Sequence, residues 1–182
     1  MSAKLNAAKS PFKINLHELP RRAGEMKEYE LNFPAPEAIG VPLLQIPAAE
    51  EIKLSFRAES VDDGVLITGQ VSSHALGECG RCLEKIELDI EQRFQELFLY
   101  ASRAAENPAE DDDLFVLDGD IADLEVPIRD AVILSMPLNP VCEPDCEGLC
   151  SGCGEKWRDL PEDHTHEVID PRWTGLAGWQ PK

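Results

Sequence analysis

The sequence lacks the features that mark several common classes of protein. No apolar run approaches the roughly 20 residues that a membrane-spanning helix needs, and nothing at the N-terminus resembles a secretory signal. We therefore expect a cytoplasmic protein in a reducing compartment. The chain also offers no Ser/His/Asp grouping, no phosphate-cradling glycine loop and no paired-carboxylate motif. These gaps count against an enzyme, and we expect a non-catalytic role.

Positive charge is scarce along most of the chain. Lys and Arg number 17 against 35 Asp and Glu, which gives a formal net charge of −18. So acidic a body repels the phosphates of nucleic acid and attracts basic proteins at long range. Residues 1–27 are the exception, and they include the pair Arg21 and Arg22. This basic arm could contact phosphate, although a solvated basic segment explains so small a cluster at least as well.

Length and composition predict one main domain with appendages. A chain of 182 residues, 43% of them hydrophobic, can bury a core of its own. We expect a basic N-terminal arm and first strand at 1–27. A single α+β core domain with an acidic loop at 101–113 would occupy 28–137. A Cys-rich metal-binding segment and tail would follow at 138–182.

Alternating apolar and polar residues, the period of a strand with one buried face, predict most of the sheet. The segments with this pattern are residues 12–16, 52–57, 65–71 and 86–90, and a further short strand is expected at 114–117. Asp62-Asp63-Gly64 is a turn signal that predicts an antiparallel hairpin. The strand at 86–90 could continue to Phe98 or end in a helix. Four prolines between Phe33 and Pro47 predict an extended connector.

From about Asp123 to Met136 the pattern changes to that of a helix. Asp123 or Glu125 can cap it, Pro127 is tolerated in its first turn and Pro137 ends it. The apolar residues at helical spacing are Leu124, Ile128, Val132 and Leu134. We expect the α+β class: a mainly antiparallel sheet or partly open barrel, one packed helix, and a C-terminal Cys-rich zinc loop.

Four of the six cysteines fall in one short stretch, C-E-P-D-C-E-G-L-C-S-G-C-G. Zinc prefers four soft ligands in a tetrahedron, and this stretch supplies them without a distant partner. The favoured ligand set is Cys142, Cys146, Cys150 and Cys153, holding a structural Zn²⁺. Disulfides and unrelated free thiols are the alternatives, and iron also occupies four-thiolate sites.

A second motif, Cys79-Gly80-Arg81-Cys82, allows a different set of four zinc ligands. Two C-x2-C knuckles facing each other form a common zinc ribbon, with ligands Cys79, Cys82, Cys150 and Cys153. Thiol-redox chemistry is a further alternative, but it needs the first cysteine at a helix N-terminus, and the residues that follow have strand periodicity. His164 and His166 could add a ligand, although four thiolates already satisfy zinc.

Two remaining segments have only general interpretations. The run Glu110-Asp111-Asp112-Asp113 lacks the spacing and glycine of a calcium-binding loop, so we expect a solvated, mobile loop. Residues 169–179 place Trp173, Leu176 and Trp179 on one side of a short amphipathic element. That element would either dock on the domain's own core or form an aromatic surface for a partner.

Taken together, the motifs resemble the YceD family, predicted metal-binding proteins of bacteria and plastids. The pieces that carry the resemblance are HELPRRAGEM, ESVDDGVLITGQV, GECGRCLE, QELF, DLEVPIRDAVILSMPL, VCEPDCEGLCSGCG and IDPRW. Cys79, Arg81 and Cys82 match the family's C-x-R-C. The stretch from Cys142 to Cys153 matches a C-terminal quartet that some members carry, in the form found in high-GC Gram-positive bacteria.

The resemblance implies a process rather than a reaction. Members are tied to accumulation of 23S rRNA, and we therefore expect a ribosome biogenesis factor that binds large-subunit proteins or precursors. The alternatives are a zinc-dependent protein that binds rRNA directly, through the metal loop or the N-terminal arm (Arg21, Arg22), and a thiol-redox protein using Cys79 and Cys82. The sequence indicates no membrane partner and leaves the oligomeric state open.

Overall fold

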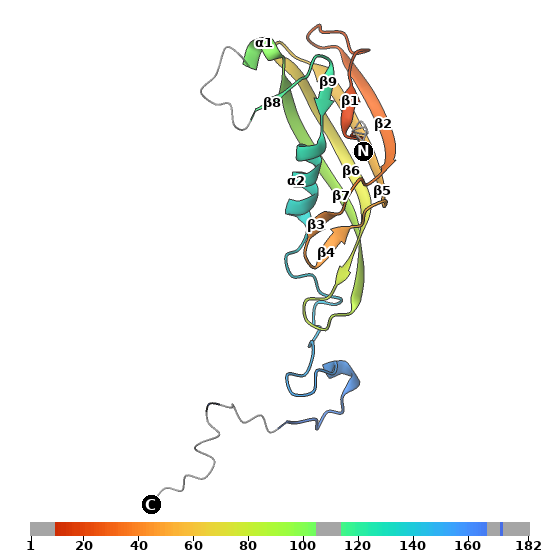
Figure 1. Ribbon diagram of the computed structural model, residues 1–182, viewed down its shortest axis with the longest axis vertical. Helices are drawn as coiled ribbons and strands as arrows, with labels where there is room; N and C mark the ends of the chain where they lie inside the picture. The colour runs from red at the N-terminus through yellow and green to blue at the C-terminus, as the bar shows by residue number, and fades with distance from the viewer. Residues whose placement is uncertain (1–9, 105–113, 167–171, 173–182) are drawn as a thin grey trace, which may run out of the picture.

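A long antiparallel hairpin forms the middle of the structure, a computed structural model that describes residues 10–104, 114–166 and 172. The strands β6 (Gly64–Glu78) and β7 (Lys85–Leu99) pair along their whole length. The hairpin runs along the long axis of the molecule, and the Cys-rich segment lies beyond its turn (Figure 1). One end of the sheet is thereby placed against the candidate metal ligands.

Strand β6 is the centre of the sheet. On one edge it pairs with β5 (Glu51–Ser60), which in turn pairs with β2 (Met26–Pro34). Further along the same edge it pairs with β4 (Leu44–Ile46), followed by β3 (Ile39–Val41), and on the far side β8 (Phe115–Val116) lies parallel to β7. Within the described residues this makes a seven-stranded, mostly antiparallel sheet that does not close into a barrel.

The strands predicted from alternation are present, and their expected faces are buried except near the start of β7, where Ile86 is half-buried and Leu88 is exposed. Ile52, Leu54 and Phe56 of β5 are buried, and β5 joins β6 through the turn at 61–63, with Ser60 opposite Val65. The strand that begins near Ile86 continues to Leu99 instead of ending in a helix. A period of two with one buried face therefore identified the central strands correctly.

Helix α2 (Glu125–Ser135) covers one face of the sheet and packs mainly against β7 and β3 (Figure 1). Leu124, Ile128 and Val132 are buried beneath it, as predicted. Leu134 was expected on the same face, but its side chain is 85% exposed. Because it follows Val132 by only two positions, it lies about 200° further around the helix.

The N-terminal segment contributes to the same core. β1 (Lys13–Asn15) pairs antiparallel with β9 (Ile121–Asp123), and the apolar residues on either side of the strand, together with Ile14, are buried. This confirms the first predicted strand. β2 then runs across residue 27, at which the sequence analysis divides the chain.

Two regions depart from the expected secondary structure. The extended connector between Phe33 and Pro47 contains the hairpin β3–β4, in which Ile39 and Leu44 are buried. Pro36, Pro42 and Pro47 lie in the loops around these three-residue strands, and Pro34 is the last residue of the edge strand β2. Strand β2 was not predicted, although Tyr29, Leu31 and Phe33 alternate with polar residues and pack against the core.

Two predicted features lie outside the described residues. The acidic loop was expected at 101–113; its first four residues form the helix α1 (Ala101–Ala104), and its residues 105–113 are among those not described. Of the tail at 169–179, only Arg172 is described. Among the helices that the structure does describe, none is both long enough and apolar enough to span a membrane.

Candidate metal centre

The turn between β6 and β7 presents the first pair of thiols. The Cys79 N–H donates to the Glu84 carbonyl at 2.7 Å, and the Leu83 N–H donates to the Cys79 carbonyl at 2.9 Å. Leu83 takes φ +59°, the left-handed conformation that a knuckle of this kind requires after its second cysteine. The Arg81 N–H also points at the Cys79 sulfur, 3.4 Å away. The turn is thus a C-x2-C knuckle on a strand hairpin, with no helix N-terminus.

The chain that leaves α2 brings the second pair of thiols to this knuckle. The Gly80 N–H donates to the Pro140 carbonyl at 2.8 Å, which holds the incoming segment beside the turn. A Cβ on Gly80 would lie only 1.8 Å from Asn139 Oδ1, so a larger residue there would displace the Asn139 side chain. The Arg81 guanidinium donates to the Cys146 carbonyl at 2.8 Å and fixes the segment's far end.

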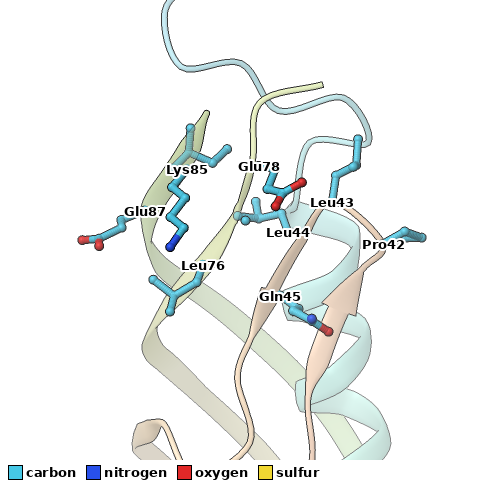
Figure 2. A pocket seen from close by; sticks show the side chains of 10 residues that line it. Pro42, Leu43, Leu44, Gln45, Leu76, Glu78, Lys85 and Glu87 are labelled. Atoms are coloured by element: carbon cyan, nitrogen blue, oxygen red, sulfur yellow. The ribbon is translucent and has the colours of Figure 1, made fainter. Parts of the chain in front are cut away.

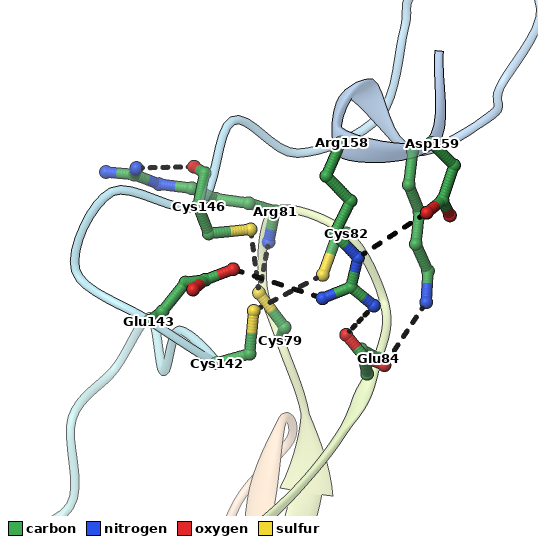
Figure 3. Close-up of polar contacts among 10 residues, drawn as sticks. Cys79, Arg81, Cys82, Glu84, Cys142, Glu143, Cys146, Arg158 and Asp159 are labelled. Atoms are coloured by element: carbon green, nitrogen blue, oxygen red, sulfur yellow. Dashed lines mark hydrogen bonds and ion pairs between the residues drawn. The ribbon is translucent and has the colours of Figure 1, made fainter.

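Four sulfur atoms converge where the two segments meet (Figure 3). The Sγ atoms of Cys79 and Cys146 are 3.8 Å apart, and those of Cys82 and Cys142 are 3.6 Å apart. All four lie within 4.8 Å of one another. Cys142 is half-buried and the other three are buried. The six cysteines of the chain are free thiols, so no disulfide accounts for this convergence.

The spacing fits a tetrahedral metal site. With metal–sulfur bonds of about 2.3 Å, the edge of a regular tetrahedron is about 3.8 Å. The Cys79–Cys146 and Cys82–Cys142 sulfur–sulfur distances agree with that edge to within about 0.2 Å. The N–H group directed at Cys79 is the type of outer contact that orients thiolate ligands. These four side chains could therefore hold a metal ion.

The thiol pKa values diverge as expected for ionisable groups packed together. Burial raises the pKa of Cys142 to about 12, with contributions from the neighbouring thiols, and burial also raises the pKa of Cys146. Burial opposes ionisation of Cys79 too, but hydrogen bonds from the Cys82 and Arg81 backbone outweigh it and lower that pKa to about 6. A divalent cation would offset the repulsion and favour the thiolate form of all four.

The structure brings together neither of the two predicted ligand sets. The favoured set, Cys142, Cys146, Cys150 and Cys153, is divided into two pairs. The alternative set pairs Cys79 and Cys82 with Cys150 and Cys153, but the structure places Cys142 and Cys146 beside that first knuckle. Cys150 and Cys153 instead lie with His164 and His166, which the sequence analysis had ranked low as ligands.

Charged side chains next to the four thiols are already paired. Arg158, from the 3-10 helix Trp157–Asp159, contacts the carboxylate of Glu84 and lies 3.9 Å from that of Glu143 (Figure 3). Lys156 lies 3.5 Å from Glu84. At the other end of the sheet, Arg21 binds Asp120 and lies over the Tyr100 ring. These basic groups are therefore engaged within the fold.

A hollow of about 540 Å³ lies along the sheet close to the metal centre. Figure 2 shows Leu44 and Gln45 of β4 on one side and Leu76, Lys85 and Glu87 of the β6–β7 hairpin on the other. The walls are mostly apolar, and charged groups stand at the rim.

A comparison with protein families identifies the family of this chain. The sequence model described as "Large ribosomal RNA subunit accumulation protein YceD" matches residues 67–179, which include β7, α2 and all six cysteines. The chain belongs to the YceD family. Membership confirms the resemblance found in the sequence and implies an association with the large ribosomal subunit or its RNA.

Similarity to individual relatives extends over nearly the whole chain. The uncharacterized protein Rv2926c of Mycobacterium tuberculosis is 41% identical over 92% of this chain and 81% of its own length. ML1660 of Mycobacterium leprae is 36% identical over 92% of this chain and 77% of its own length. YlbN of Bacillus subtilis is 24% identical over 88% of this chain and 90% of its own length. No solved structure matches the chain.

Proposed function

We propose that this YceD protein is a non-catalytic ribosome biogenesis factor. It supports accumulation of 23S rRNA by binding a basic large-subunit protein, or an assembly intermediate that displays one. Family membership supports the process, and the acidic open face of the sheet supports the mode of binding. A structural Zn²⁺ at Cys79, Cys82, Cys142 and Cys146 would hold the end of that face in shape.

The proposal depends on a row of exposed carboxylates on the open face of β7. Glu87, Asp89 and Glu91 occupy alternate positions and are all exposed, opposite the face that α2 covers. Asp89 also lies 2.5 Å from His74 Nδ1 of β6, a surface contact that a cationic partner would replace. Glu78 ends the neighbouring strand beside these three carboxylates. We call these four residues the acidic stripe. Carboxylates aligned along a rigid strand can pair with successive Lys or Arg side chains of a partner, and they repel RNA phosphate.

The hollow beside the acidic stripe adds apolar contact area. Leu43 and Leu76 line it with partly exposed side chains, and Glu78 and Glu87 of the stripe stand at its rim (Figure 2). A basic segment with an interspersed apolar side chain fits both features, because the leucines can bury that side chain while the carboxylates bind the flanking cations.

The proposed metal site suits a structural role. Four thiolates complete the tetrahedron and leave no position for an activated water, which hydrolysis at zinc requires. Thiol-redox chemistry through Cys79 and Cys82 has little support, because both side chains are buried among the other thiols. Direct rRNA binding has little support either, since Arg21, Lys156 and Arg158 are each engaged by acidic partners.

Affinity purification from cell lysate tests the proposal. We expect the wild-type chain to enrich large-subunit proteins or precursors. The triple variant Glu87→Lys, Asp89→Lys, Glu91→Lys should lose most of that enrichment. Its control, Glu28→Lys, Glu30→Lys, Glu51→Lys, makes the same change of charge on the same face at the other side of the sheet and should retain it.

Two results would contradict the proposal. The first is enrichment no greater than that of an unrelated protein of equal net charge. The second is an equal loss in both triple variants, which would show that total charge matters and the acidic stripe does not. Filter binding to 23S rRNA covers the alternative, because tight binding with a steep salt dependence would favour direct contact with RNA.

A further inference from the structure

The second cluster of metal-ligand side chains lies outside the four-thiol site. Cys150, Cys153, His164 and His166 each offer one ligand atom, and these atoms all lie within 4.8 Å of one another. The Cys153 sulfur is 3.5 Å from His164 Nε2. For bonds of about 2.3 Å to sulfur and about 2.05 Å to nitrogen, the sulfur–nitrogen edge of a tetrahedron is about 3.6 Å. The observed separation fits that edge.

The backbone around Cys150 forms a knuckle of its own. The Gly152 N–H points at the Cys150 sulfur, 3.4 Å away, and the Gly154 N–H donates to the Cys150 carbonyl at 2.8 Å. Gly154 takes φ +78°, as the closing residue of such a turn must. The turn therefore matches the knuckle at Cys79, where a backbone N–H also points at the first sulfur.

Packing brings the two histidines onto this knuckle. The His164 N–H donates to the Pro161 carbonyl at 3.0 Å, and the His164 ring meets the Trp157 ring edge to face at 5.6 Å. The His166 ring lies so close to Gly152 that a Cβ there would come within 2.3 Å of it. Gly152 thus leaves room for His166 to reach the thiols, and a larger residue at this position would clash with the histidine.

We propose that Cys150, Cys153, His164 and His166 form a second zinc site, independent of the four-thiol site. Two thiolates balance the charge of Zn²⁺, so the site can form near the surface without a counter-ion. The four-thiol site would instead carry net negative charge, and the paired side chains of Arg158 and Lys156 lie beside it. Zn²⁺ binding would fix the chain at 149–166 and release the two thiol protons to solvent.

The two sites differ in their access to solvent. Cys153 and His166 are exposed, whereas three of the four thiols in the first site are buried. A chelator therefore reaches the second ion more easily, and we expect zinc to leave in two phases. The faster phase belongs to the Cys2His2 site.

Zinc analysis of the full chain, purified without chelators, tests the assignment. We expect two equivalents per wild-type chain and one in His164→Ala/His166→Ala, with an unchanged far-ultraviolet circular dichroism spectrum. The chain has four histidines, so His17→Ala/His74→Ala is a matched control that should keep both equivalents. His164→Cys/His166→Cys should restore the second equivalent, because thiolates replace imidazole as zinc ligands.

The rate of zinc release to a chelator provides a second measurement, which would not change in this way if the histidines only supported the fold. The fast phase of zinc release should vanish in the double alanine variant while the slow phase keeps its rate. One equivalent in the wild-type chain, or two retained in the alanine variant, would overturn the second site. Loss of both equivalents in that variant would overturn its independence. None of these outcomes depends on the ribosomal role, which the purification experiment tests separately.

Discussion

Replacing Cys82 with serine tests whether a metal at the four-thiol site clamps the chain across a long loop. Cys82 and Cys142 are 60 positions apart, and Cys79 and Cys146 are 67 apart. A cross-link that closes a loop of that length lowers the entropy of the unfolded chain by the equivalent of about 4 kcal/mol. For a chain of this size, each kcal/mol corresponds to roughly 2–4 °C in Tm. We therefore expect Cys82→Ser to lower Tm by roughly 8–16 °C.

The assay is thermal unfolding followed by circular dichroism, with and without a strong zinc chelator. Without chelator, the wild-type chain should melt well above Cys82→Ser. With chelator, the two should melt within a few degrees of each other, because both then lack the clamp. Cys153→Ser serves as the control, since Cys153 and His164 close a loop of only 11 residues outside the sheet. Cys153→Ser should therefore change the Tm of the main unfolding transition only slightly.

A difference between wild type and Cys82→Ser that persists in chelator would refute this reasoning. The loss would then come from packing of the buried side chain and not from metal binding. Equal Tm values in the absence of chelator would refute it as well, because removing one of four ligands would have had no effect.

Three smaller predictions concern the helix and the knuckle turns, and each is checked by chemical denaturation. Ile128→Ala should lower the free energy of unfolding by about 2–5 kcal/mol, because this side chain is fully buried. Leu134→Ala, on the outer face of the helix, should change it by less than about 0.5 kcal/mol. Equal losses in the two variants would contradict the placement of α2. Gly148→Ala should lower the free energy of unfolding by about 1–2 kcal/mol, because Gly148 has φ +85° and a Cβ there would lie 3.0 Å from the Arg81 carbonyl oxygen. Leu83→Gly should be neutral or stabilise by up to about 1 kcal/mol, since Leu83 is 58% exposed and takes a positive φ; a marked loss would show that its side chain has an unrecognised contact.

Much of the fold could be predicted because local periodicity reports burial directly. β5, β6 and α2 each bury one face, so their apolar residues recur at the period of the element. Leu134 was grouped with the buried face although it is out of phase with Ile128 and Val132, and the helical period itself places it on the outer face, where a single large apolar side chain can be exposed. Strand β2 carried a usable signal in Tyr29, Leu31 and Phe33, and the hairpin β3–β4 was masked by its flanking prolines.

The ligand grouping depends on tertiary structure, which spacing does not report. Four cysteines close in sequence looked self-contained, but the β6–β7 turn takes two of them and leaves Cys150 and Cys153 for another partner. That partner was visible as His164 and His166, just downstream of the C-x2-C. A single four-thiolate site leaves no role for the histidines, whereas the structure gathers the candidate ligands into two groups, and cysteine spacing alone does not report the number of groups.

The ratio of 23S to 16S rRNA in living cells tests the central claim most directly. The measurement uses bacteria that lack their own copy of this gene and are complemented with variants at equal protein levels. We predict that the wild-type chain and Leu134→Ala restore the ratio, while Cys82→Ser and the Glu87/Asp89/Glu91 lysine variant do not. Full restoration by both defective variants would contradict the account, because neither the metal clamp nor the acidic stripe would then matter for rRNA accumulation.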